Sequence, residues 1–150
     1  MTTQDSSTNR ICEEILTTCA VTNLRKLTRL VTNGFNERIK SSGLRTTQIC
    51  VILSIGREQG KPLTSYADEL CMDLSTLTRS LDTLEKNGLI LLKSGRRRER
   101  LAYLTKDGIQ KIAEVYPLWQ RAQADFIKTF GRDSWKNYLR AATGATDSAG

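Results

Sequence analysis

Residues 63–104 read LTSYADELCMDLSTLTRSLDTLEKNGLILLKSGRRRERLAYL, and the local patterns within them predict the fold class. Thr64 can open a short helix that lasts to about Cys71. After a tight turn, Ser75 can cap a second helix that ends before Gly88. Two short helices joined by a tight turn form a helix-turn-helix unit, so we expect that unit here.

The second helix of this unit has an apolar face and a polar face. Leu77, Leu81 and Leu84 recur at spacings of four and three residues, which places them on one side. The opposite side carries Thr76, Arg79, Ser80 and Thr83. Such a helix fits the major groove of DNA, where arginine can bind guanine through two hydrogen bonds. Our candidate DNA readers are Thr76, Thr78 and Arg79; the alternative is an amphipathic surface helix with a solvated arginine.

The end of the stretch predicts a two-stranded hairpin with a basic tip. The apolar runs 89–92 and 101–104 have the length of short strands. Three consecutive arginines between them repel one another, but they suit the minor groove of DNA, whose negative potential attracts arginine. We interpret the hairpin as a DNA-binding wing rather than a solvated basic loop. Its candidate DNA contacts are Lys93, Arg96, Arg97 and Arg98.

The charge of the chain favours a polyanionic partner. The 150 residues include 23 Lys and Arg against 16 Asp and Glu, a formal net charge of +7. Eight basic and only three acidic residues lie between Thr76 and Lys106, so most of the excess is in the helix-turn-helix and the hairpin. No run approaches the about 20 apolar residues that span a bilayer, and Met1–Asn9 is polar. We therefore expect a cytoplasmic protein that binds double-stranded DNA and no membrane.

Long amphipathic patterns lie on both sides of residues 63–104. Apolar residues recur every three to five positions over residues 11–40, which predicts one helix of about 45 Å that ends at 41–43. A single domain of this size does not need such a length for its own core, so we expect part of the helix to meet a second copy. The alternative is a long core helix of a monomer. Thr46 or Thr47 can cap a central core helix that contains the apolar run 49–55.

The C-terminal part predicts two more helices. Thr105 caps a helix that keeps its apolar spacing to about Phe130, and Pro117 within it predicts a kink or a local loss of hydrogen bonding. A last short helix covers residues 134–142. We expect three of its residues at an interface: Trp135, Tyr138 and Leu139.

Four short motifs together resemble a known family. They are QICVIL at 48–53, LSTLTR at 74–79, LEKNGLI at 84–90 and LTKDG at 104–108. In this order and spacing they are similar to the MarR (multiple antibiotic resistance regulator) family of winged helix-turn-helix transcriptional regulators. The resemblance implies a mainly α fold with a two-stranded β wing. It also implies a homodimer that reads a palindromic operator.

The resemblance divides the chain, which we take as a single domain of residues 1–150, into functional parts. Residues 11–41 and 105–143 correspond to the helical dimerisation part, and residues 44–104 to the DNA-binding part. The polar ends, 1–9 and 144–150, are expected to be flexible.

The family pattern also suggests individual DNA contacts. Its recognition-helix contacts correspond to Ser75, Thr76, Thr78 and Arg79. Arg98 resembles the wing-tip arginine of the family's Asp-x-Arg pattern, but Arg96 takes the place of the aspartate. The loop that precedes the arginines is about two residues shorter than usual. We expect a more basic wing tip whose DNA binding is more sensitive to salt.

Two kinds of signal are compatible with the resemblance. Family members respond to small phenolic or lipophilic molecules, or to oxidants through cysteine. Candidate ligand-pocket residues are Asn23, Phe35 and Arg45; the alternative is that they are ordinary core or surface residues. Candidate redox sensors are Cys19 and Cys12, because organic hydroperoxide regulators of this family carry a cysteine in a similar place. Seven residues apart on one helix, their Cα atoms would be about 10.5 Å apart, too far for a disulfide within one folded chain.

The residue types exclude most other chemistry. Histidine is absent and no CxxC pair occurs, so we expect no metal and no cofactor. Cys50 is expected to be an inert core thiol and Cys71 a packing residue. We expect a transcriptional regulator, acting as a repressor that a ligand or an oxidant releases, with no catalytic residue. The alternatives are an architectural protein that binds nucleic acid regardless of sequence and, remotely, a thiol peroxidase.

Overall fold

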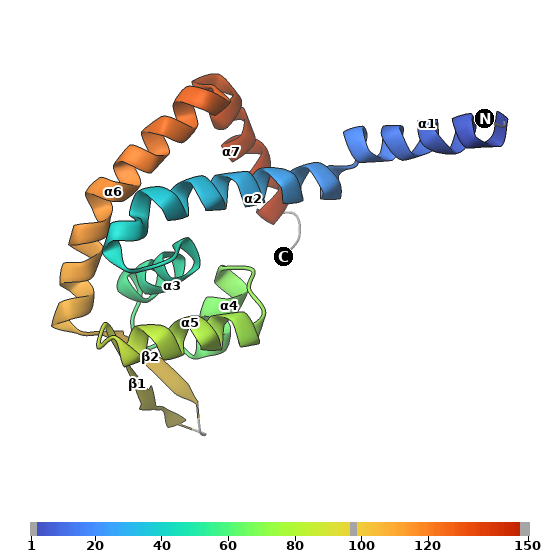
Figure 1. Cartoon of the computed structure of the whole chain (residues 1–150). Coiled ribbons are helices and arrows are strands. Elements are labelled where there is room, and N and C mark those ends of the chain that lie inside the picture. Colours follow the sequence, from blue (N-terminus) through green and yellow to red (C-terminus); the bar gives the residue numbers. More distant parts are fainter. Residues whose placement is uncertain (1–2, 97–98, 148–150) are drawn as a thin grey trace. The chain divides into compact units, whose positions relative to one another are not determined.

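Helices make up most of the computed structural model, which describes residues 3–96 and 99–147, and a two-stranded antiparallel sheet accompanies them (Figure 1). This confirms the predicted mainly α, winged helix-turn-helix class. The chain divides into two compact units, residues 1–34 and 35–150. The elements are α1 (Thr3–Thr18), α2 (Ala20–Ile39), the 3-10 helix η1 (Lys40–Ser42), α3 (Thr46–Arg57), α4 (Leu63–Glu69), α5 (Leu74–Lys86), β1 (Ile90–Ser94), β2 (Arg100–Leu104), α6 (Lys106–Phe130) and α7 (Arg132–Asp147).

The prediction of one helix over residues 11–40 is wrong. Helix α1 already begins at Thr3, and the helical pattern is interrupted at Cys19. The hydroxyls of Thr17 and Thr18 each donate to the carbonyl four residues earlier, both at 2.7 Å. The amide of Asn23 donates to the carbonyls of Thr17 at 3.0 Å and Cys19 at 2.9 Å. Local side-chain hydrogen bonds therefore compete with a continuous helix here and satisfy the backbone at the break.

The core of the second unit surrounds α3. As predicted, α3 is buried through Val51, Ile52 and Ile55. Helices α4 and α5, the hairpin and α6 contribute the other buried side chains, among them Tyr66, Leu77, Leu81, Leu84, Ile90, Ala102 and Val115. Cys50 does not belong to this core, because the residue is exposed. The predicted core position of Cys50 is therefore wrong. Its inertness stays a prediction, which is supported because desolvation raises the pKa of its thiol.

The N-terminus of α3 is capped from outside the helix. Neither Thr46 nor Thr47 caps it, because Arg45 is the cap residue and its N–H donates to Gln48 Oε1 at 2.8 Å. Asn36 Oδ1 accepts the N–H of Thr46 at 2.8 Å and its hydroxyl at 2.7 Å. A side chain from α2 thus satisfies the backbone donor that a local cap was expected to satisfy.

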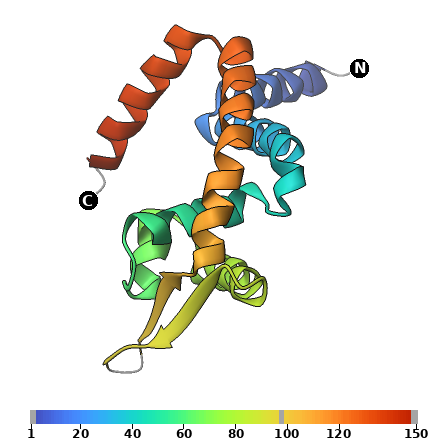
Figure 2. The same ribbon diagram turned by 90° about the vertical axis from the view of Figure 1, so that its left-hand side faces the viewer.

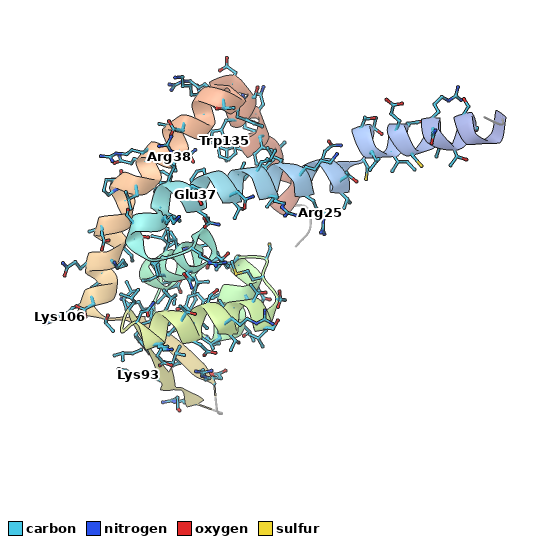
Figure 3. The ribbon with its side chains drawn as sticks, viewed as in Figure 1. Arg25, Glu37, Arg38, Lys93, Lys106 and Trp135 are labelled. Carbon is cyan, nitrogen blue, oxygen red and sulfur yellow. The ribbon has the colours of Figure 1, made fainter. Side chains whose placement is uncertain are left out.

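Of the two C-terminal helices, α6 has the predicted bounds and α7 is longer than predicted. Thr105 caps α6 as expected, with its Oγ1 accepting the N–H of Gly108 at 2.9 Å, and α6 runs through Pro117 without interruption. Helix α7 starts at Arg132 rather than 134 and extends to Asp147, so residues 144–147 continue the helix. The ring of Trp135 packs on Phe126, with centroids 5.1 Å apart, and so covers α6 (Figure 3). The role of this region in dimerisation stays a prediction.

Candidate nucleic-acid interface

Helix α5 packs one face against the core and leaves the other toward solvent. Leu77, Leu81 and Leu84 are completely buried, which confirms the predicted apolar face. Ser80 was expected on the free face but is also buried, and its hydroxyl donates to the carbonyl of Thr76 at 3.1 Å. Arg79 is exposed on the opposite side. The free face is therefore narrower than predicted.

Asp73, rather than Ser75, caps α5. Its carboxylate accepts the N–H of Thr76 at 2.8 Å and the hydroxyl of Thr76 at 2.6 Å, and it also accepts the hydroxyl of Ser75. These hydrogen bonds, the one from Ser75 first, hold the pKa of Asp73 well below its ordinary value. The sequence interpretation missed this residue because the run D-L-S-T offers several possible caps within four positions.

Replacing Asp73 by alanine should lower the temperature of thermal unfolding at pH 7, because α5 loses its cap. The carboxylate stabilises the folded state above its unfolded-state pKa of about 3.9, and this stabilisation is lost as the pH falls through the lower folded-state pKa. The difference in midpoint between wild type and variant, measured by circular dichroism, should therefore shrink progressively below about pH 4. Asp82→Ala, an exposed residue of the same helix, is the control. A difference that does not change with pH would contradict this role.

The predicted readers at the start of α5 differ in what their side chains are free to do. The hydroxyls of Ser75 and Thr76 donate to Asp73, and that of Thr78 donates to the carbonyl of Leu74 at 2.7 Å. Each hydroxyl oxygen keeps lone pairs with which it can accept from a base. Within the described residues, the guanidinium of Arg79 has no hydrogen bond or ion pair, so all of its donors remain available. Contact of these residues with DNA stays a prediction.

The hairpin follows α5 and has the form expected of a wing. Strand β1 pairs with β2 in the register Ile90↔Leu104 to Ser94↔Arg100. At the tip, the N–H of Gly95 donates to the carbonyl of Glu99 at 2.7 Å. Figure 2 shows the hairpin projecting away from the helices.

The structure describes two of the four basic residues predicted to contact DNA from the wing. Arg96 is exposed near the tip, whereas Arg97 and Arg98 lie outside the described residues. Lys93 is exposed on β1 (Figure 3), and its Nζ lies 4.9 Å from the centroid of the Tyr103 ring. A cation over an aromatic face is held loosely in place, which keeps the ammonium group on the hairpin surface.

A polar cluster that sequence interpretation missed joins α3 to α4. Glu69 accepts the hydroxyl of Ser54 at 2.6 Å and pairs with Arg57 at 2.7 Å and Lys61 at 3.9 Å. The Ser54 hydrogen bond, helped by these cations, lowers the pKa of Glu69. The cluster fixes the first helix of the helix-turn-helix to the core helix, and no local spacing rule indicates it.

The turn between α4 and α5 needs an unusual backbone conformation. Helix α4 begins at Leu63 after Pro62, so Thr64 does not cap it. Cys71 has a φ of 50°, in the left-handed region that non-glycine residues rarely adopt, and it is exposed. The expected packing role of Cys71 is therefore wrong, and the residue instead provides the sharp turn.

The three candidate ligand-pocket residues have other contacts. Asn23 donates to the backbone at the α1–α2 break, the ring of Phe35 packs on Phe126 with centroids 6.4 Å apart, and Arg45 is the exposed cap residue of α3. An apolar cavity of about 230 Å³ lies instead between α3 and α6. Its lining residues are Ile49, Leu53, Ile112, Val115, Tyr116 and Trp119.

The two candidate sensor cysteines differ in their surroundings. Cys12 is exposed, whereas Cys19 is half-buried at the break before α2. The backbone N–H of Thr22, then its hydroxyl, then the N–H of Val21 lower the pKa of the Cys19 thiol. These donors belong to the first turn of α2, where an anion is stabilised.

Two broader features limit the chemistry of the described part of the chain. Residues 3–96 and 99–147 contain no group of three or more metal-ligating side chains placed to hold an ion. In the same residues, no helix is both long enough and apolar enough to cross a membrane.

Known proteins resemble the chain in sequence and in fold. No protein-family profile matches it. YwoH, an HTH-type transcriptional regulator of Bacillus subtilis, is 30% identical over 106 residues, which are 68% of this chain and 75% of YwoH.

Three solved structures are similar in fold. MosR of M. tuberculosis, in complex with DNA, has a TM-score of 0.76 and 24% identity, over 87% of this chain and 96% of MosR. PcaV of Streptomyces coelicolor, in complex with its natural ligand, has a TM-score of 0.78 and 18% identity, over 90% and 96%. A MarR-family regulator from Silicibacter pomeroyi has a TM-score of 0.69 and 18% identity, over 89% and 92%.

Proposed function

The chain belongs to the MarR family of DNA-binding transcriptional regulators, and we propose that it is a repressor that binds a palindromic operator as a homodimer. The observation that carries the proposal is the exposed Arg79 on α5 beside a hairpin that presents Lys93 and Arg96. A helix in the major groove reads the base sequence. A basic wing in the adjacent minor groove positions the protein on the DNA.

Exposed apolar side chains outside the DNA-binding part support the homodimer. Water contact with so many large apolar groups is unfavourable, and burying them between two copies removes this cost. In α1 and α2 these residues are Ile11, Ile15, Leu16, Val21, Leu24 and Leu30, each at least 50% exposed. In α6 and α7 they are Ile109, Tyr116, Trp119, Tyr138 and Leu139. Two copies related by a two-fold axis fit a palindromic DNA site.

The apolar cavity between α3 and α6 supports release by a small ligand. Its lining has no charged side chain, which favours a lipophilic, aromatic molecule over a strongly charged one. Helix α3 packs against the helix-turn-helix, and α6 continues into α7. A ligand that binds more tightly to one relative arrangement of α3 and α6 would favour that arrangement. In the homodimer this would change the distance between the two recognition helices.

Oxidation of Cys19 is the second release route that we propose. The thiolate attacks one oxygen of a hydroperoxide, the O–O bond breaks, and the alcohol leaves after taking a proton, so the cysteine becomes a sulfenic acid. The lowered pKa of Cys19 raises the fraction of reactive thiolate. The added oxygen would disturb the hydrogen bonds that the sulfur accepts from Thr22 in the first turn of α2.

The redox route can be tested with a duplex enriched by the wild-type protein from a random-sequence library, called here the selected duplex. With an organic hydroperoxide, wild type should lose affinity for the selected duplex about tenfold or more, and a thiol reductant should restore it. Cys19→Ser should bind as wild type does without peroxide and keep its affinity with peroxide. Cys12→Ser is the matched control and should respond as wild type does. If Cys19→Ser is released like wild type, the redox route through Cys19 fails and the ligand route remains.

A further inference from the structure

A side chain of the recognition helix holds one strand of the wing. Glu85, near the end of α5, accepts the backbone N–H of Leu92 in β1 through Oε1 at 3.0 Å. This N–H is therefore not used for pairing with β2, and it lies on the outer edge of the hairpin. A strand edge of this kind otherwise exposes its donors to water.

The other strand is held by a different part of the molecule. The N–H of Leu104 in β2 donates to Gln59 Oε1 at 2.8 Å, and the N–H of Gly60 donates to the carbonyl of Ala102 at 2.9 Å. Both partners belong to the loop before α4. Within residues 3–96 and 99–147, Glu85 provides the only hydrogen bond from a side chain of α5 to the hairpin.

This hydrogen bond lies far enough from the tip of the hairpin for a small change at Leu92 to displace the tip. Leu92 is half-buried and packs against the core, whereas Gly95 at the tip lies three residues further along the strand. At about 3.3 Å per residue, the tip is about 10 Å beyond the attachment point. A small rotation at Leu92 therefore moves Arg96, next to Gly95, by a larger amount.

We propose that Glu85 is a positioning residue for DNA binding. It sets the angle between the recognition helix and the wing, so that Arg79 and Arg96 reach one duplex together. This inference rests on the proposed contact of the wing with DNA. Glu85 is itself exposed and negative beside a basic surface, so it weakens attraction to phosphate. If it had no positioning role, its removal would raise DNA affinity.

The sign of the change in affinity therefore tests the proposal. Asp82→Ala, which removes an exposed carboxylate from the same helix, should raise affinity for the selected duplex slightly. Glu85→Ala should instead lower it about threefold to tenfold, since a hydrogen bond to a charged group is lost. Glu85→Gln keeps an acceptor oxygen and should bind at least as well as wild type. A rise for Glu85→Ala equal to that for Asp82→Ala would overturn the proposal.

Two further measurements separate positioning from a general loss of structure. The loss caused by Glu85→Ala should become smaller in an Arg96→Ala background, because a wing contact is already absent there, and should persist in an Arg79→Ala background. Amide exchange at Leu92, followed by NMR without DNA, should become faster in Glu85→Ala while the core amides stay protected. An undiminished loss in the Arg96→Ala background would overturn the positioning role. If Arg96→Ala alone leaves affinity unchanged, Arg96 does not contact DNA and this inference fails, whereas the proposed reading of DNA by α5 is tested separately by Arg79→Ala.

Discussion

Arg79→Ala is expected to lower affinity for the selected duplex about 10- to 100-fold at fixed salt. Arginine that binds a guanine through two hydrogen bonds contributes about 1–3 kcal/mol of discrimination, and about 1.4 kcal/mol corresponds to tenfold in affinity. In the free protein, no partner among the described residues competes for this guanidinium. Affinity for unrelated DNA should change much less, because only one phosphate attraction is lost.

The matched control for this experiment is Lys86→Ala. Lys86 is an exposed cation in the last turn of the same helix, so its removal changes the net charge equally. Fluorescence anisotropy at several salt concentrations separates the two effects, since loss of a phosphate contact reduces the salt dependence without changing base preference. Equal losses for Arg79→Ala and Lys86→Ala would mean that Arg79 contributes charge and does not read a base.

Gly108→Ala should destabilise the fold by about 3 kcal/mol, because it overpacks a site with no room. A Cβ at Gly108 would lie 2.0 Å from the backbone carbonyl oxygen of Leu89, which also accepts the N–H of Thr105 at 3.1 Å. No side-chain rotation relieves a clash with a backbone atom, so either the start of α6 or the start of the hairpin must move. The midpoint of thermal unfolding should fall by about 6–12 °C.

Gly34→Ala provides the contrast for this prediction. A Cβ at Gly34 meets nothing within 4 Å, and the residue lies inside α2. Alanine is favoured over glycine in a helix by about 1 kcal/mol, so this variant should unfold at or above the wild-type temperature. Calorimetry on both variants distinguishes a steric effect at Gly108 from a general effect of replacing glycine. An unchanged midpoint for Gly108→Ala would contradict the packing described here.

The helix-turn-helix and the hairpin could be predicted because local patterns determine them. Leu77, Leu81 and Leu84 mark the buried face of α5 by their spacing alone, and Gly88 marks the end of that helix. The apolar runs on either side of the arginines match the two strands within two residues at each end. Patterns of this kind depend on neighbours in sequence, so they need no knowledge of the rest of the fold.

The sequence did not predict features for which several neighbouring residues are equally suitable, or which depend on contacts between distant parts of the chain. Several hydroxyl and carboxylate residues could cap α5, and only the backbone geometry at Asp73 decides among them. Asn36 accepts the N–H of Thr46 at the start of α3 from a position ten residues earlier, on another helix. The attachment of Glu85 to Leu92 likewise depends on how the hairpin folds back on α5. The interruption at Cys19 follows from Thr and Asn side chains that bond their own backbone, a weak signal inside an apolar pattern.

Competition for the labelled selected duplex tests the central claim of sequence-specific regulation most directly. Unlabelled selected duplex and unrelated DNA of equal length are compared as competitors at one fixed salt concentration, and the number of chains per duplex is measured by sedimentation. We predict two chains per duplex and at least about 10³-fold stronger competition by the selected duplex. Equal competition by both DNAs would contradict the claim and would indicate a protein that binds DNA regardless of its sequence.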